Sequence, residues 1–186
     1  MSIEELVEAI RSCRRCVFTG KPFLAHEVYE RWLPKRVKLL LIAESPPPGR
    51  KRTFFYNLDV PDRLRRNMRA ILGLEVPDHG VLSWMKDSGI FLTAAIKCRP
   101  IRPEDKARDE RLLRHMAFCC SDILALEVKV LKPEKIMLMG RIAELAAKMA
   151  GLRPCEVFPH PNYVVRFRRD LIPVIREAIL RAISCP

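Results

Sequence analysis

Residues 37–49 read Val37-Lys38-Leu39-Leu40-Leu41-Ile42-Ala43-Glu44-Ser45-Pro46-Pro47-Pro48-Gly49. A short apolar run that ends in a proline-rich turn is typical of a strand buried on both faces of a sheet. Residues 90–96 form a second run of this kind, residues 135–140 a third, and residues 156–159 a shorter fourth. The sequence therefore predicts four strands, the first of which ends directly before Glu44.

Helical patterns separate these strands. Ser2 and Glu5 form a capping box ahead of apolar residues at helical spacing, which predicts a first helix leading to Cys13. We expect further helices over residues 61–72, 79–88, 104–131, 141–150 and 170–183. Pro173 suits the first turn of the last one. The alternation predicts an α/β fold, a single domain over residues 1–186, with a central, mostly parallel four-stranded sheet and helices on both faces.

Ligands of open parallel sheets bind beyond the carboxyl ends of the strands. In this chain those ends carry Glu44, residues 94–100, Gly140 and the run His160-Pro161-Asn162, which we interpret as a turn. The polar and unusual residues thus gather at one edge of the predicted sheet, which indicates a single site there.

The charge balance favours a polyanionic partner. The 186 residues hold 34 Lys and Arg against 22 Asp and Glu, a net charge of +12, and neutralised phosphates release condensed counterions. A merely basic surface is the alternative. The chain lacks the ~18-residue apolar run of a membrane span and begins without a signal-peptide pattern. We therefore expect a cytoplasmic monomer with no membrane contact.

The cysteines indicate a metal centre. An intracellular chain with an odd number of cysteines, seven here, uses them for metal ligation more readily than for disulfides. Cys13 and Cys16 form a C-x-x-C pair, Cys98 follows the second strand, and either Cys119 or Cys120 supplies a fourth sulfur. Four soft donors suit zinc or an iron–sulfur cluster. Buried apolar cysteines are the alternative.

Five segments resemble, in the same order, the uracil-DNA glycosylase superfamily, and within it the iron–sulfur members often called family 4. The first is the C-x-x-C pair, and the second, a strand followed by Gly-Glu-Ala-Pro-Gly in the family, is Ala43-Glu44-Ser45-Pro46-Pro47 here. The remaining three are the run Ala94-Ala95-Ile96-Lys97-Cys98-Arg99-Pro100, the segment from Cys120 through Pro133 to Met139-Gly140, and His160-Pro161-Asn162-Tyr163.

The resemblance implies a DNA glycosylase of base excision repair, which hydrolyses the N-glycosidic bond of a flipped-out uracil or other deaminated or damaged base. Glu44 would stabilise the cationic sugar or orient water, and His160 would stabilise the departing base. The resemblance also implies a [4Fe–4S] cluster, with zinc as the alternative, in a lobe of the domain. Its ligands would be Cys13, Cys16, Cys98 and Cys120; Cys119 remains an alternative to Cys120.

Further roles follow from the same resemblance. Phe55, or else Phe54, would stack on the base, and Ala94 and Asn162 occupy other positions of the base site. The run Tyr163-Val164-Val165 is the candidate for the wedge that fills the gap in the DNA. The basic residues expected to meet the phosphates of double- or single-stranded DNA are Arg50, Lys51, Arg52, Arg166, Arg168 and Arg169.

One departure bears on function. Ala94 stands where the family has an asparagine that recognises the uracil edge, and a methyl group neither donates nor accepts a hydrogen bond. The prolines after Glu44 also leave fewer backbone N–H groups for contacts. The alternative reading is therefore a non-catalytic iron–sulfur protein of the same fold that binds nucleic acid.

Overall fold

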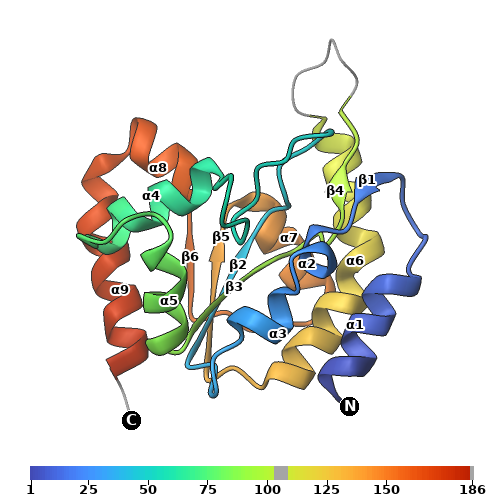
Figure 1. The fold of residues 1–186 in the computed structure, drawn as a ribbon, viewed down its shortest axis with the longest axis horizontal. Coiled ribbons are helices and arrows are strands. Elements are labelled where there is room, and N and C mark those ends of the chain that lie inside the picture. Colours follow the sequence, from blue (N-terminus) through green and yellow to red (C-terminus); the bar gives the residue numbers. More distant parts are fainter. Residues whose placement is uncertain (103–108, 185–186) are drawn as a thin grey trace.

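The computed structural model describes residues 1–102 and 109–184. A four-stranded parallel sheet runs through its centre in the order β3-β2-β5-β6 (Figure 1). Its strands are β2 (Leu39–Ala43), β3 (Ile90–Ala94), β5 (Lys135–Met139) and β6 (Glu156–Phe158). The predicted α/β class and parallel four-stranded sheet are confirmed.

Helices cover both faces of this sheet, as predicted (Figure 1). One face carries α4 (Arg63–Leu72), α5 (Gly80–Asp87), α8 (Pro161–Phe167) and α9 (Ile172–Ser184), with the 3₁₀ turn η1 (Arg169–Leu171) between the last two. The other face carries α1 (Ile3–Ser12), α6 (Glu110–Leu131), α7 (Arg141–Met149) and the short α2 (Pro22–Ala25) and α3 (Val28–Trp32). The stretch 104–108, which we expected to begin the long helix, lies outside the described residues.

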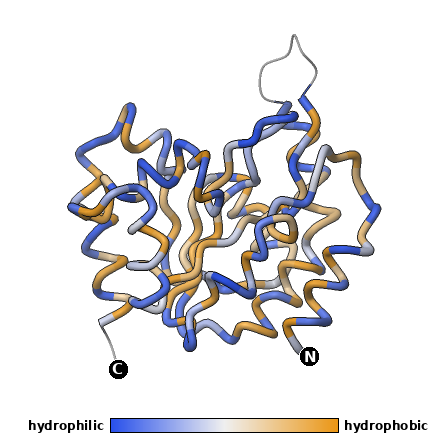
Figure 2. Tube along the Cα trace, viewed as in Figure 1, coloured by the Kyte–Doolittle hydropathy of each residue, from blue (hydrophilic) through white to orange (hydrophobic). Residues whose placement is uncertain are grey.

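Strands β2 and β3 explain why the sequence was informative. Every residue of β2 and of β3 is buried, and the strands run in register from Leu39 beside Ile90 to Ala43 beside Ala94. Figure 2 shows these apolar strands between the two helical layers. Burial on both faces needs a continuous apolar run rather than an alternating one.

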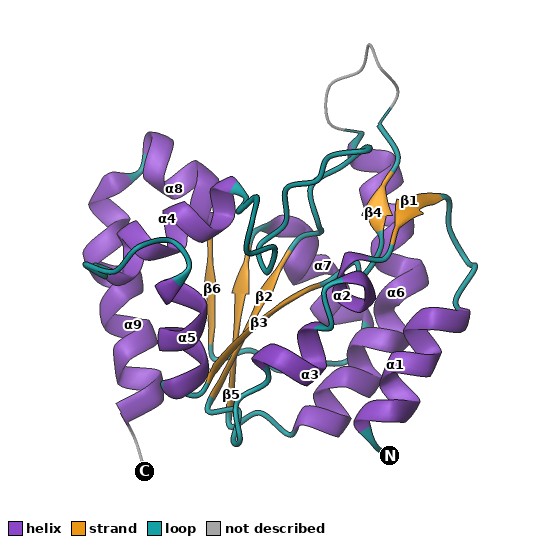
Figure 3. Cartoon of the chain, in the orientation of Figure 1, coloured by secondary structure: helices purple, strands orange, loops and turns teal. Residues whose placement is uncertain are grey.

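The strands differ from the expectation in two places. The second strand ends at Ala94 instead of residue 96, although the amides of Ala95 and Ile96 still donate to the carbonyls of Ala43 (2.8 Å) and Glu44 (3.0 Å). A separate antiparallel pair, β1 (Phe18–Gly20) with β4 (Arg99–Pro100), lies outside the central sheet (Figure 3). These strands are too short to give a periodic signal.

Local signals at the helix ends agree with the structure. Ser2 and Glu5 form the expected capping box on α1, and Pro173 is the second residue of α9. Asp62 caps α4 by accepting a hydrogen bond from the amide of Arg65. None of the described helices combines the length and the apolar character that crossing a membrane requires.

Candidate functional site

Glu44 and His160 meet at the carboxyl edge of the sheet. Glu44 directly follows β2, and His160 lies two residues beyond the end of β6. Both side chains line two cavities. The first cavity, of ≈ 580 Å³, has walls from the proline-rich loop after β2, from α4 and from Asn162. The second cavity, of ≈ 570 Å³, has walls from α7, β6 and Tyr163. The two candidate catalytic residues therefore stand where these cavities adjoin.

The orientation of His160 is fixed by its own helix. The sequence predicted a turn here, but Pro161 opens helix α8 and His160 is its N-cap, since proline suits the first helical position. The Nδ1 atom of His160 accepts a hydrogen bond from the amide of Asn162 at 3.2 Å. Nδ1 therefore acts as an acceptor in this arrangement, which places the proton of the neutral ring on Nε2.

Gly140, at the end of β5, allows His160 to lie so close to the sheet. Its φ of +100° lies in the region that only glycine adopts readily. A Cβ at this position would stand 3.3 Å from the Cβ of His160. The amide of Gly140 also donates to the carbonyl of Phe158 at 2.8 Å, which ties the two strand ends together.

The first cavity has a basic rim and polar walls. Its cations are Lys51, Arg63 and Arg66. Asp62 also lines it, and burial raises the pKa of this carboxyl. Because like charges gather at its mouth, the cavity suits a ligand that carries phosphates.

The residues of the expected base site lie in different places in the structure. Asn162 lines the first cavity, but Phe54, Phe55 and Ala94 are not among the described lining residues of either cavity. Phe54 is 2% exposed and packs edge-on against Phe23 at 5.3 Å. Phe55 is 2% exposed and packs edge-on against Tyr56 at 5.0 Å. Both rings, like the buried Ala94, belong to the core in this conformation.

The expected wedge is also partly wrong. Val164 is fully buried, because the helical path of α8 turns it toward the core, so it cannot contact DNA here. Tyr163 is 50% exposed, and its ring stacks on the exposed Phe167 at 5.3 Å. The basic residues that we expected to contact phosphates are all exposed: Arg50, Lys51, Arg52, Arg166, Arg168 and Arg169.

Several of these arginines have intramolecular contacts. Arg168 forms an exposed ion pair with Asp170 at 2.8 Å, and Arg166 lies over the ring of Phe167 at 4.9 Å. Exposed pairs of this kind contribute little to stability, so both cations remain able to exchange these contacts for phosphate.

The predicted cysteine ligands come together from three segments. The pKa of Cys16 is raised to about 11, mainly by burial and next by the neighbouring Cys120 and Cys119 thiols. Burial followed by Cys120 and Cys16 raises the pKa of Cys98 to about 12. Such mutual effects require the sulfur atoms to be neighbours, and metal binding relieves the repulsion between thiolates.

Cys120 is more central to this group than Cys119. Of the neighbouring thiols, Cys120 has the largest effect on the pKa of both Cys16 and Cys98. The Sγ of Cys119 instead lies 3.6 Å from Nε2 of His115 on its own helix. Within residues 1–102 and 109–184, no three His, Cys, Asp or Glu side chains are placed to hold a single metal ion. Four thiols are the donor type that a soft metal centre uses, and both the centre and its identity stay predictions.

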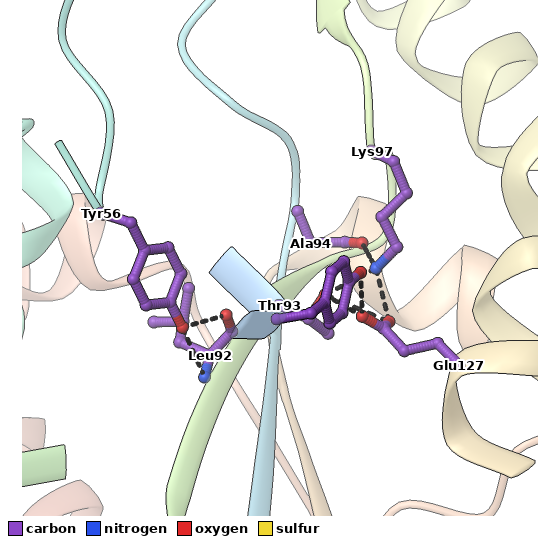
Figure 4. A network of polar contacts seen from close by, with 7 residues as sticks. Tyr56, Leu92, Thr93, Ala94, Lys97 and Glu127 are labelled. Atoms are coloured by element: carbon purple, nitrogen blue, oxygen red, sulfur yellow. Dashed lines mark hydrogen bonds and ion pairs between the residues drawn. The ribbon is translucent and has the colours of Figure 1, made fainter. Parts of the chain in front are cut away.

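A buried polar network connects the end of β3 to α6 (Figure 4). The Nζ of Lys97 lies 2.5 Å from Oε2 of Glu127, and both side chains are at most 1% exposed. Glu127 also accepts hydrogen bonds from Tyr29 (2.7 Å) and Thr93 (2.8 Å). Lys97 donates in addition to the carbonyl of Ala94. The network holds the end of β3 and Cys98 against the helix that carries Cys120.

Sequence reasoning missed most of this supporting layer. Glu127 and Tyr29 are distant in sequence from Lys97, and only the fold brings them together. Asn67 on α4, which donates to the side chain of Asn162 at 2.7 Å, was likewise not expected. Gly140 did carry a signal, since a glycine between a strand and a helix marks a tight backbone approach.

Comparison with known proteins yields two similarities. A family model described as the uracil DNA glycosylase superfamily matches residues 30–183. The Type-4 uracil-DNA glycosylase of Sulfurisphaera tokodaii is 26% identical over 141 residues, which are 75% of this chain and 55% of that protein. The chain therefore spans little more than half the length of this relative. Glu44, Cys98, Cys120 and His160 lie within the range of the family model, whereas Cys13 and Cys16 precede it.

Proposed function

Because the chain belongs to the uracil DNA glycosylase superfamily, we propose that it hydrolyses the N-glycosidic bond between DNA and a flipped-out base. The base is uracil or another deaminated or damaged base. The observation that carries the proposal is the meeting of Glu44 and His160 between two cavities, under a rim of cations. A protein that only bound DNA would need neither residue.

Each residue has a role that suits its position. Cleavage of the glycosidic bond leaves positive charge on the sugar and negative charge on the base. The Glu44 carboxylate stabilises the sugar cation or orients the attacking water. His160 donates from Nε2 to the base as its negative charge develops, since Nδ1 is engaged with the Asn162 amide.

The base would enter the first cavity, where Asn162 supplies an amide and the proline-rich loop supplies an apolar wall. Phosphates on either side would meet the exposed cations Arg50, Lys51 and Arg52, and those at the end of α8, Arg166, Arg168 and Arg169. Stacking on Phe54 or Phe55 would require these rings to leave their present packing.

We also propose that Cys13, Cys16, Cys98 and Cys120 hold a [4Fe–4S] cluster, with zinc as the alternative. The support is the convergence of four soft donors and the likeness to a Type-4 uracil-DNA glycosylase. Such a cluster would cross-link the N-terminal segment, the end of β3 and α6. It would take no part in the hydrolysis that Glu44 and His160 perform.

The test is an excision assay with duplex and single-stranded oligonucleotides that carry uracil, hypoxanthine, xanthine or an oxidised pyrimidine, followed by alkali to cleave abasic sites. We expect cleavage with at least one of these bases. Ala94, in place of a base-recognising asparagine, favours the second candidate function, a non-catalytic nucleic-acid-binding protein. Salt-sensitive DNA binding without cleavage of any substrate would support that function instead.

A further inference from the structure

A third cavity, of ≈ 580 Å³, lies on the far side of the loop that bounds the first cavity. Its walls come from the region of β1, α2 and α3, from Lys51 and Arg52, and from residues 56–59. It contains neither Glu44 nor His160 among its described lining residues, so the catalytic proposal does not use it.

Cations outnumber acids in this third cavity. Lys21, Arg31, Lys51, Arg52 and Arg99 line it, against Glu27 and Asp59. Lys21 is occupied by three backbone carbonyls, and Arg31 pairs with Glu27 at 2.8 Å. Lys51 and Arg52 are exposed, and within the described part of the chain neither enters an ion pair. These two side chains are available to phosphate groups.

Flat and apolar side chains form the wall beneath these cations. Trp32 is half-buried, with its ring 6.4 Å from that of Tyr56 at an angle of 32°. The His26 ring stacks on Phe54 at 5.3 Å and 32°, and burial, followed by the nearby Arg99, lowers the pKa of this imidazole. Leu58 is 49% exposed at the mouth. Aromatic surfaces beneath backbone-binding cations are the usual means of binding single-stranded nucleic acid.

The third cavity adjoins the candidate active site. Lys51 lines both the third and the first cavity. Arg99, in the wall of the third, donates to the carbonyls of Pro47 at 2.6 Å and Thr53 at 3.2 Å, and both of these residues line the first cavity. The buried Arg99 guanidinium therefore holds the loop between the first and third cavities. Lys51 on this loop lines both of them.

We propose that the third cavity binds an unpaired nucleotide of the DNA strand whose flipped base occupies the first cavity. Its base stacks on Trp32, and its phosphate meets Lys51 and Arg52. A base paired in a duplex cannot enter, so this subsite favours a single-stranded flank. The assignment of the strand rests on the proposed function; the ability to bind an unpaired nucleotide does not.

The chain offers a direct test, because it has only two tryptophans. Trp84 on α5 is not among the described lining residues of the third cavity. In a Trp84→Phe variant all tryptophan emission comes from Trp32, and in a Trp32→Phe variant it comes from Trp84. Both substitutions keep an aromatic ring in place. Each variant is titrated with an undamaged ten-nucleotide oligothymidine, with a blunt duplex of equal length, and with thymidine monophosphate.

We expect the oligothymidine to quench Trp32 emission saturably and to leave Trp84 emission unchanged. The duplex should quench Trp32 emission at least tenfold less than the oligothymidine does, because stacking on an aromatic side chain needs an unpaired base. An Arg52→Ala variant should make oligothymidine binding less sensitive to salt. The slope of the logarithm of the binding constant against the logarithm of the salt concentration should fall by roughly 0.7 in magnitude, the value for one phosphate contact on a single strand. The control for it, Arg153→Ala, removes an exposed cation outside the cavity.

Unchanged Trp32 emission, equal quenching of both tryptophans, or equal affinity for the monophosphate and the oligothymidine would overturn the proposal. The assay needs no damaged base, so the two proposals fail separately. Excision without quenching of Trp32 removes the nucleotide subsite alone. Quenching without excision of any base removes the glycosylase function and leaves the subsite.

Discussion

Asn67 on α4 donates a hydrogen bond from Nδ2 to Oδ1 of Asn162 on α8 over 2.7 Å. Because that oxygen is engaged, the Nδ2 group of Asn162 is the part of the amide that remains to meet a ligand in the first cavity. A donor in this position favours a base that presents a carbonyl oxygen and disfavours one that presents an amino group. We propose that Asn162 thereby takes the role of the asparagine that the resemblance places at the position of Ala94.

Asn162→Asp should lower excision of uracil or hypoxanthine by roughly 10- to 100-fold, because a carboxylate cannot donate to a carbonyl oxygen. Asn67→Ala should have a smaller effect on rate but should reduce the preference for carbonyl-bearing bases, since the Asn162 amide is then free to turn. Single-turnover rates on matched substrates measure both effects. Equal base preference in all three proteins would show that Asn162 does not select the base.

Glu44→Gln and His160→Asn should each reduce the single-turnover excision rate by about 100-fold or more. Removal of one preorganised charge or donor at a developing ion has effects of that size. Glu144→Gln is the control for the first, since Glu144 lines only the second cavity, and His79→Asn is the control for the second. Binding of the substrate should change little. If excision persists at the wild-type rate in both site variants, the assignment of Glu44 and His160 is wrong.

Gly140→Ala should affect stability and activity together. The φ of +100° at this residue costs a side-chain-bearing residue about 1–3 kcal/mol, and the new methyl group would press on His160 at 3.3 Å. We expect a lower thermal midpoint and a lower excision rate. Gly151→Ala is a matched control, because it also has a positive φ but has nothing within 4 Å of the added Cβ. It should lose stability without losing activity per folded molecule.

Much of the fold follows from the sequence because β2 and β3 are buried on both faces and so appear as unbroken apolar runs. The site was predictable to the extent that it lies at strand ends, as Glu44 does. The helix after His160 was harder to predict from the sequence, although Pro161 at a first helical position was a usable signal. With that helix recognised, its period would have placed Val164 in the core and Tyr163 outside. The burial of Phe54 and Phe55 had no local signal, because it depends on packing against Phe23 and Tyr56.

Breaking the Lys97–Glu127 pair should destabilise the protein strongly. Glu127→Gln leaves the Lys97 ammonium buried without a counter-charge, which costs about 3–5 kcal/mol. The double variant Lys97→Met with Glu127→Leu should recover part of that loss, because it removes both buried charges. Thermal unfolding of the purified wild type and variants measures this. A single variant as stable as the wild type would show that the pair is not needed to hold β3 against α6.

Cys120→Ser and Cys119→Ser form a matched pair for the metal centre. After burial, Cys120 is the largest cause of the raised pKa of both the Cys16 and the Cys98 thiols, whereas the Sγ of Cys119 lies 3.6 Å from Nε2 of His115. We therefore expect the purified wild type and Cys119→Ser to be brown, with broad visible absorption and about four irons per chain for a [4Fe–4S] cluster. Cys120→Ser should lose most of the absorption and the iron. The reverse pattern would assign the fourth ligand to Cys119, and a colourless wild type with one zinc per chain would replace the cluster by zinc.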